Sequence, residues 1–365
     1  MNKKINVAVT GYFRTGSSAI VDLLREYDCV RVVPFEDKSY EHDLFYHHGG
    51  LFDLCTLLSH GNSSFSSDKT IGTFVTEMKR LNDYNYVWFG SYKKMFGDKF
   101  MDLVYSFVDD ISEKRDDRTT NHIKKARFSF IKLFAQLFYR TFRKRRFTNY
   151  GVWYVYDKED IYYSMPTNEE LYAAAKKFTS GYFNLFNSNS DDFAKVSIYD
   201  HIIWPSQVDE FANCFDDTFK VIVVDRDPRD LFVMEKYMPT GKKPHFPTDP
   251  SNFINEWKRT VVKDITNKNA MILHFEDLVY NYDETIKRIE SFLGILSSSH
   301  TKPKQFFDND KSIENTQVFL TFDEWEKETK QIEAELKDYL FVFPYRRKPK
   351  RDLMFADDGI GKIKI

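Results

Sequence analysis

Apolar and polar residues alternate along the first part of the chain in a pattern that predicts a strand, a helix and a second strand. Val7–Thr10 form a short apolar run that ends at a glycine, as buried parallel strands often do. From Ile20 to Tyr27, apolar residues recur at intervals of three and four, which places them on one face of a helix. Val30–Val33 follow as the second strand. This unit predicts an α/β fold in which helices flank a central parallel sheet.

The same strand-turn-helix pattern returns twice in the second half of the chain. A strand over Lys220–Asp225 precedes a helix for which Asp227 is the expected N-cap. Another strand is expected to end at Phe275. The helix after it is expected to begin with a capping box between Asn281 and Glu284.

The middle and the end of the chain have different patterns. Residues from about 60 to 190 are rich in Phe, Tyr and Lys and carry few strand signals, so we interpret them as a mostly helical insertion. Residues 346–365 have no convincing periodicity and are interpreted as a loosely attached C-terminal extension. Residues 1–345, with the insertion, are expected to form a single domain.

The net charge and the cysteines argue against several classes of function. With a formal net charge of −2, no global field favours nucleic acid, so any anion site must be built locally. The three cysteines, Cys29, Cys55 and Cys214, include no C-x-x-C spacing, which argues against a disulfide framework or a structural zinc site. A reducing, cytoplasmic location is therefore expected. We also expect no signal peptide and no transmembrane segment, since no apolar run approaches ~20 residues.

The turn after the first strand, GYFRTGSS, has the features of a phosphate-binding loop. Gly11 and Gly16 have the spacing of the Walker A pattern, and Ser18 stands where that pattern has its Mg²⁺-binding hydroxyl. Ser17 occupies the lysine position, while the cation lies within the loop at Arg14. The backbone amides at the start of the helix, which the helix dipole assists, are expected to point at an anion. An ordinary serine-capped turn is the alternative.

Two arginines follow the later strand, in the sequence DRDPRD. Arg226 lies at the carboxyl end of that strand, the edge at which open α/β sheets bind ligands. Arg226 and Arg229 are therefore candidates to bind a second phosphate. The alternative, which applies chiefly to Arg229, is an ion pair with Asp225 or Asp230.

Together these stretches resemble the sulfotransferases that use 3′-phosphoadenosine 5′-phosphosulfate (PAPS). The loop is similar to that family's phosphosulfate loop, G-x-x-[KR]-[ST]-G-[ST]-[ST], which this chain matches with Gly11, Arg14, Thr15, Gly16, Ser17 and Ser18. The sequence DRDPRD is similar to the family's 3′-phosphate motif, and FEDL with ETIKRIESFLG is similar to its late strand-helix unit. The matches are scattered from residue 5 to about 345 and do not cover the middle insertion.

The resemblance implies an enzyme that transfers a sulfonyl group from PAPS to a hydroxyl or amine, releases 3′-phosphoadenosine 5′-phosphate (PAP) and needs no metal. It implies a three-layer sulfotransferase fold in which the loop, Arg226 and Arg229 bind the donor. Arg14 would support the charge that develops on the leaving phosphate. Two departures stand out. Met234 occupies a position where members usually have a serine that contacts the 3′-phosphate, and YRRKPKR does not match their Arg-Lys-Gly loop.

The resemblance also suggests candidates for the catalytic base. Glu36 lies just after the second predicted strand, where some glycan-modifying members place a glutamate. Other members use a histidine later in the fold, and the sequence SIYDH supplies His201 with Asp200 beside it. We rank Glu36 first, His201 second and Asp200 third. The position of Glu36 and the aromatic insertion favour a carbohydrate or glycolipid acceptor.

Two other clusters and two rival functions stay open. His42, His47 and His48 are close in sequence, but their spacing matches no common zinc site. The basic run Arg143–Arg146 could contact an acidic glycan or a membrane surface, although a solvated helix end explains it more simply. The first rival function is a metal-dependent P-loop kinase, which would lack the Walker lysine. The second is a non-catalytic sulfotransferase-like protein that binds a nucleotide or glycan, a reading that Met234 favours.

Overall fold

The computed structural model of the chain describes residues 4–33, 42, 44–83, 92–115, 134, 161–187, 194–238 and 243–355. The chain divides into two compact units. The sheet unit comprises Met1–Tyr46 and Phe186–Ile365, and the helical unit comprises His47–Leu185.

A five-stranded parallel sheet forms the centre of the sheet unit, which confirms the predicted α/β class. Its strands are β1 (Ile5–Gly11), β2 (Val30–Val32), β5 (Val196–Asp200), β6 (Phe219–Asp225) and β7 (Ala270–His274). They lie in the order β2-β5-β1-β6-β7, and every neighbouring pair is parallel. The first two strands of the chain are therefore not neighbours, because β5 lies between them. The neighbouring strands β1 and β6 end at the same edge of the sheet, and the candidate loop begins there.

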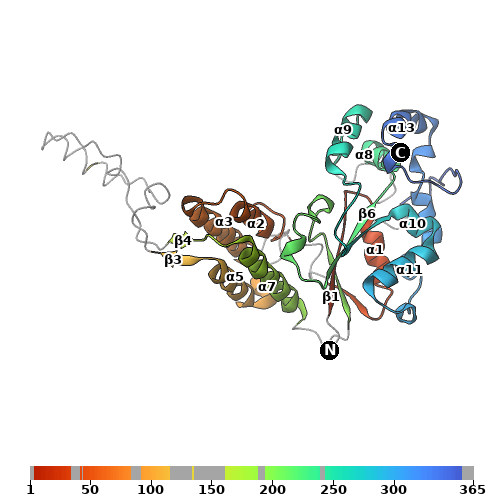
Figure 1. Cartoon of the computed structure of the whole chain (residues 1–365). Coiled ribbons are helices and arrows are strands. Elements are labelled where there is room, and N and C mark those ends of the chain that lie inside the picture. Colours follow the sequence, from red (N-terminus) through yellow and green to blue (C-terminus); the bar gives the residue numbers. More distant parts are fainter. Residues whose placement is uncertain are drawn as a thin grey trace. The chain divides into compact units, whose positions relative to one another are not determined.

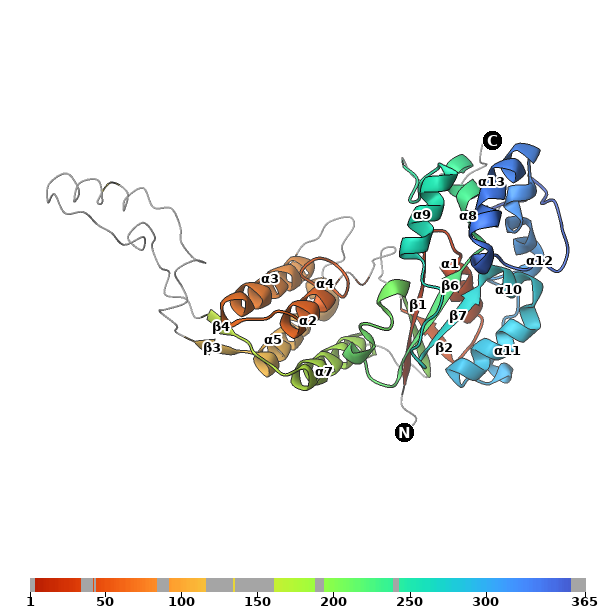
Figure 2. The ribbon, with the colours of Figure 1, turned by 45° about the horizontal axis from the view of Figure 1, so that its top comes forward.

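One helical layer packs against this sheet through a continuous apolar core. It contains α1 (Ser17–Leu24), α10 (Phe275–Tyr280) and α11 (Tyr282–Leu293), which gather on one side of the strands in Figures 1 and 2. Leu23, Leu278 and Ile289 are fully buried there against Val7 and Val9 of β1. The predicted apolar face of the first helix is thus the face that covers the sheet.

A second apolar core lies beyond the carboxyl ends of the strands. It joins α8 (Pro228–Tyr237), α9 (Pro250–Thr260) and α13 (Asp323–Glu335), which lie together in Figure 2. The predicted start of α8 is confirmed: the Asp227 carboxylate accepts from the Arg229 amide at 2.9 Å, and Pro228 is the first helical residue. Met234 is buried within this core.

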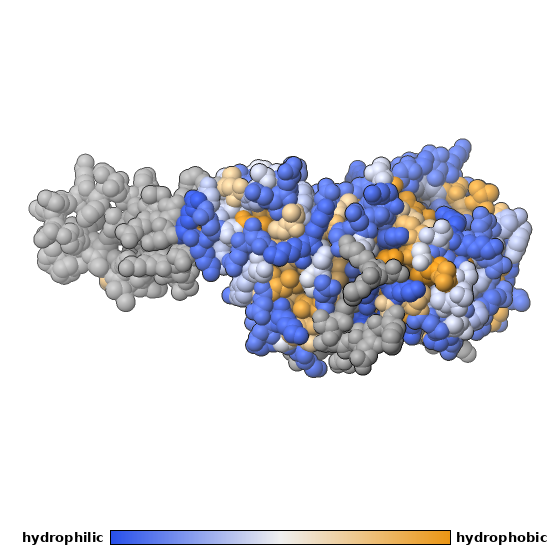
Figure 3. Space-filling view, turned by 60° about the horizontal axis from the view of Figure 1, so that its bottom comes forward, coloured by the Kyte–Doolittle hydropathy of each residue, from blue (hydrophilic) through white to orange (hydrophobic). Residues whose placement is uncertain are grey.

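The helical unit is built from several helices and a short antiparallel hairpin. Its elements are α2 (Leu51–Ser59), α3 (Ser64–Asp83), α4 (Tyr92–Phe96), α5 (Lys99–Ile111), β3 (Glu113–Arg115), β4 (Ile161–Tyr163) and α7 (Asn168–Asn187), of which α7 ends in the sheet unit. Phe74, Phe107 and Phe178 form its centre, with ring centroids 4.9–6.1 Å apart. Hydrophilic residues cover much of the face drawn in Figure 3, and hydrophobic residues form smaller patches on it.

Two local expectations are corrected. α11 begins after Asn281 as predicted, but the Asn281 side chain makes no capping hydrogen bond and instead donates to Asp277 at 3.3 Å. The predicted capping box is therefore wrong. The C-terminal extension is not loosely attached over residues 346–355: Arg347 pairs with Glu314, and Phe355 is 5% exposed. Buried charge and apolar area, which the aperiodic sequence does not reveal, hold this segment.

Within the described ranges, no helix is both long enough and apolar enough to cross a membrane.

Candidate functional site

The loop between β1 and α1 needs both of its glycines for steric reasons. A Cβ atom at Gly11 would lie 2.3 Å from the Thr15 hydroxyl and 2.6 Å from the Val224 carbonyl oxygen. Gly16 has φ of 97°, and a Cβ there would lie 2.8 Å from the Phe275 ring. The loop is thus packed tightly against the end of β6 and the start of α10, and its conformation is closely determined.

Four backbone amides lie at the start of α1. That of Thr15 donates a hydrogen bond within the loop, and the next three have no acceptor in the described structure. The Thr15 amide and hydroxyl both donate to the Tyr12 carbonyl, at 3.2 and 2.8 Å, so Thr15 closes the turn of the loop, and its contact with the donor stays a prediction. In the described structure, the amides of Gly16, Ser17 and Ser18 have no hydrogen-bond acceptor, and α1 lacks a side-chain cap. Three such donors at a positive helix end are an arrangement that can accept an anion.

Arg14 has a structural contact that the sequence did not reveal. It has φ of 64°, and its Nη1 donates to the carbonyls of Met234 and Met238, both at 2.6 Å. These carbonyls belong to the C-terminal end of α8, where a cation is favoured. Arg14 therefore ties the loop to α8, and its assignment to the developing charge stays a prediction.

Arg226 connects the loop with the C-terminal part of the sheet unit. It is 3% exposed, its Nη1 donates to the Arg14 carbonyl at 3.3 Å, and its Nη2 donates to the Asn315 carbonyl. The guanidinium carbon lies 4.8 Å from the centre of the Phe275 ring. This buried cation is therefore positioned from three sides at the carboxyl end of β6.

A cavity of about 460 Å³ opens beside the start of α1, a volume within the roughly 300–1,000 Å³ of ligand pockets. Residues of the loop, of α1, of the start of α10 and of the segment 304–315 line it. Its cationic residues are Arg14, Arg226, Lys304 and Lys311, and its aromatic residues are Phe275, Phe306, Phe307 and Phe355. Cations and rings in one cavity suit a ligand that has both phosphate groups and a planar base.

Glu26 fixes the far wall of this cavity. Its carboxylate is fully buried just after α1 and accepts from the amides of Lys304, Phe306 and Phe307 at 2.9–3.1 Å. The same carboxylate lies 2.7 Å from Nε2 of His300. The Glu26 side chain thus holds the segment 304–307 against the end of α1, the helix that begins at the candidate loop.

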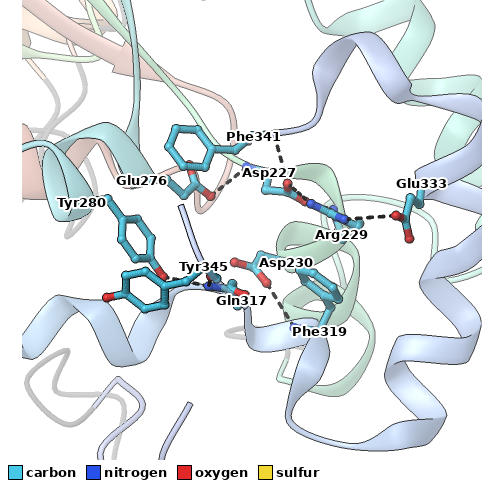
Figure 4. A network of polar contacts seen from close by, with 10 residues as sticks. All are labelled: Asp227, Arg229, Asp230, Glu276, Tyr280, Gln317, Phe319, Glu333, Phe341 and Tyr345. Carbon is cyan, nitrogen blue, oxygen red and sulfur yellow. Dashed lines mark hydrogen bonds and ion pairs between the residues drawn. The ribbon is translucent and has the colours of Figure 1, made fainter. Parts of the chain in front are cut away.

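Arg229 has a different environment from Arg226. Its Nε and Nη2 both donate to the Asp227 carboxylate, at 2.9 and 2.8 Å, and Nη1 lies 3.7 Å from Glu333 (Figure 4). Arg229 does not line the cavity. The ion pair that the sequence offered as the alternative is present, with Asp227 as the partner in place of Asp225 or Asp230. Its predicted role as a phosphate ligand therefore has no geometric support.

Several carboxyl groups near Arg226 and Arg229 are buried. Glu276 accepts from the Asp227 amide at 3.0 Å, and Asp230 accepts from the Phe319 amide at 3.1 Å (Figure 4). Burial raises the pKa of Asp230 to about 7 and that of Asp225 to about 6, and it raises the pKa of Glu276 well above its usual range. Burial penalises the charged forms, although Arg226 partly offsets this at Asp230 and Glu276.

Asp230 should make stability depend on pH. Because its pKa is higher in the folded protein than the ordinary 3.8, its contribution is fully present below about pH 4 and is lost as pH rises through about 7. We expect Asp230→Asn to flatten the fall in unfolding free energy over this window, by up to about 1.4 kcal/mol per pH unit. Urea unfolding at several pH values measures this slope. Exposed Asp338→Asn is the control, and an unchanged slope in Asp230→Asn would contradict the assignment.

The structure brings Asp200 and His201 together at the carboxyl end of β5. Nδ1 of His201 lies 2.7 Å from Oδ1 of Asp200, and His201 has φ of 50°. Neither residue lines the cavity. Glu36, the first-ranked base, and the basic run Arg143–Arg146 lie outside the described residues.

The three clustered histidines do not come together as ligands. His42 is fully buried, which lowers its pKa to about 3, whereas His48 is exposed and lies 2.9 Å from Asp53. Across the described parts of the chain, no three His, Cys, Asp or Glu side chains are grouped so that they could hold a metal ion.

Sequence reasoning missed Glu26, Lys304 and Lys311. Nothing in the local pattern marks them, since each looks like an ordinary charged residue near a helix end or in a loop. Only the fold brings the segment 304–315 onto the loop after β1.

Comparisons with known proteins add no relative: a scan against family models and a search of curated proteins both found no match.

Proposed function

We propose that the protein is a PAPS-dependent sulfotransferase with a P-loop-like sulfotransferase fold, acting on a hydroxyl-bearing acceptor. The observation that carries this proposal is the start of α1. There, the amides of Gly16, Ser17 and Ser18 have no acceptor in the described structure, and Gly16 and Ser18 line the same cavity as Arg226. Ser17 replaces the lysine of a nucleotide kinase. An anion held by amides and side-chain cations does not require Mg²⁺ for charge neutralisation.

The residues of the cavity fit such a donor. The amides of Gly16, Ser17 and Ser18 would hold the phosphosulfate end, and Arg226 would hold a phosphate. The cavity's aromatic rings would take the planar base. When bound, PAPS supplies an activated sulfonyl group on a phosphate oxygen. Lys304 and Lys311 are the cations that could replace the missing serine at Met234, which is buried away from the cavity.

The acceptor hydroxyl must lose a proton to this chain. His201 is the described candidate: the contact with Asp200 favours a proton on Nδ1, so Nε2 is the nitrogen that would accept one. Glu36, which ranks first from its place in the sequence, stays a candidate base. Asp200 acts in this scheme by orienting His201.

Calorimetry with the full chain tests the proposal. We expect PAP to bind without Mg²⁺ and at least tenfold more tightly than ATP does, because two separate phosphates match the separated cations and amides. Tighter binding of ATP that depends on Mg²⁺ would instead indicate a kinase. A non-catalytic binding protein remains the second candidate because Arg14 is engaged by α8 and Met234 cannot donate. PAP binding without any sulfated product over a glycan panel would favour it.

A further inference from the structure

Arg226 is a buried cation that no carboxylate neutralises by direct contact within the described structure. The residue is 3% exposed, and its guanidinium donates to two carbonyl oxygens, those of Arg14 and Asn315. Its buried Nε has no acceptor there. Because a buried charge without an ion pair acts over a longer distance, Arg226 affects both the cavity that it lines and the acidic side chains packed near it.

Two of these acidic side chains, Asp230 of α8 and Glu276 of α10, form what we call the carboxyl pair. Both are fully buried, and they interact electrostatically with each other (Figure 4). Each accepts a hydrogen bond from one backbone amide, but Oδ2 of Asp230 and Oε2 of Glu276 have no partner in the part of the chain that the structure describes. Since an ionised carboxylate with an unsatisfied buried oxygen is costly, this geometry favours protonation of the pair.

Arg226 is the main cation that acts on the carboxyl pair. Burial raises the pKa of both carboxyl groups, and Arg226 opposes this more than any other neighbour does. The Asp227 carboxylate raises both pKa values further, although Arg229 holds it through two hydrogen bonds, and Arg229 acts on Asp230 only weakly. The remaining titratable groups nearby interact with these residues but form no hydrogen bond with the pair in the described structure: Asp225, His274, Tyr280 and Glu333.

We propose that the carboxyl pair takes up a proton when the cavity binds an anion at Arg226, so that affinity for phosphate and sulfate esters falls as pH rises through neutrality. An anion in the cavity and an ionised pair compete for the field of the same guanidinium. The pKa of Asp230, which burial raises to about 7, places this competition in the neutral range. The inference rests on the anion site of the proposed function and adds its regulation by pH.

The sign of the effect follows from linkage. A bound anion adds negative charge near the pair and raises the pKa of both carboxyl groups above the values of the empty protein. At low pH the pair is protonated whether or not the anion is bound, and the affinity is at its highest. At high pH the pair is ionised in both states, and the affinity is at its lowest. Between these limits, binding takes up a fraction of a proton.

The test needs a ligand that does not titrate over the same range. A phosphate monoester gains its second charge near pH 6, which would strengthen its binding as pH rises and oppose the expected effect. Adenosine 5′-phosphosulfate has no phosphate monoester, and its phosphosulfate group is ionised throughout the neutral range. We therefore choose it as the probe, with inorganic sulfate as a second probe that does not titrate either.

Calorimetry of the full chain with adenosine 5′-phosphosulfate, in two buffers that differ in ionisation enthalpy, counts the protons taken up on binding. We expect an uptake of about 0.3–0.5 proton near pH 7. The affinity should be about two- to sixfold lower at about pH 8 than at about pH 6. This measurement uses the wild-type protein alone, so it does not depend on whether any variant folds.

A double variant identifies the groups that take up the proton. Asp230→Asn with Glu276→Gln removes both carboxyl groups while each side chain keeps an oxygen to accept from its backbone amide. We expect this variant to take up no proton and to bind the probe with nearly the same affinity across this pH range. Glu290→Gln, at a buried carboxyl of α11 that does not line the cavity, is the matched control and should keep the wild-type pH dependence.

The outcomes separate this inference from the proposed function. If the probe binds with an affinity that does not change with pH and without proton uptake, the linkage is overturned and the anion site stands. Uptake that persists unchanged in the folded double variant would place the proton elsewhere and would also overturn it. If neither probe binds at any pH, the proposed anion site fails, and the linkage fails with it.

Discussion

Replacing Arg226 by alanine is expected to weaken binding of PAP by about 10- to 100-fold. The guanidinium lines the cavity beside α1 and also joins the Arg14 carbonyl to the Asn315 carbonyl. Its loss would remove a cation that could donate hydrogen bonds to a phosphate. It would also remove the hydrogen bonds that join two walls of the cavity. Arg226→Lys should bind with intermediate affinity, because an ammonium group keeps the charge but cannot contact both carbonyls with a planar fork.

Calorimetry measures this effect, and thermal unfolding of the same samples shows how much of the loss is structural. Arg259→Ala, at an exposed arginine of α9, is the matched control and should leave the affinity unchanged. An Arg226→Ala variant that binds PAP like the wild type would show that Arg226 does not contact the donor.

Glu26→Ala should have the largest effect on stability. Its removal would leave the amides of Lys304, Phe306 and Phe307 and the His300 ring without their buried acceptor. Loss of one member of such a buried charged network typically costs about 3–5 kcal/mol. Glu26→Gln keeps one acceptor oxygen and should cost less. The free energy of unfolding in urea measures both.

Amide hydrogen exchange distinguishes a local role of Glu26 from general destabilisation. We expect the amides at 304, 306 and 307 to exchange faster in Glu26→Gln while those of β1 and β6 keep their protection. Asp28→Ala is the control, since this nearby carboxylate is exposed and lies 3.7 Å from Lys302. Unchanged exchange at the three amides would show that other contacts hold the wall of the cavity.

Features that depend on a few neighbouring residues were predictable from the sequence. Apolar runs predict β1 and β6, helical periodicity predicts α1, and the Asp-Pro start predicts α8. All four elements lie within a few residues of their predicted positions. The glycine-bounded loop was predictable for the same reason, because its spacing reflects a local backbone requirement.

Features that depend on the packing of distant segments were not predictable. The contact of Arg14 with the end of α8 joins residues 220 and 224 positions apart, and the Glu26 network joins residues more than 270 apart. The pairing of Arg229 with Asp227 was missed for another reason. Several carboxylates lie within reach in the sequence, and only the geometry selects one.

The order of the strands has a consequence for the synthesis of the protein. β1 leaves the ribosome first, yet its partners are far downstream, since Ile5 pairs with Val196 and Asn6 with Phe219. At about 5–20 residues per second, β1 would wait roughly 10–40 seconds for a neighbour. During this time the helical unit, which is synthesised between β1 and β5, can begin to fold. The apolar strand that carries the candidate loop is thus exposed longest in the nascent chain, which makes it a natural target for chaperones.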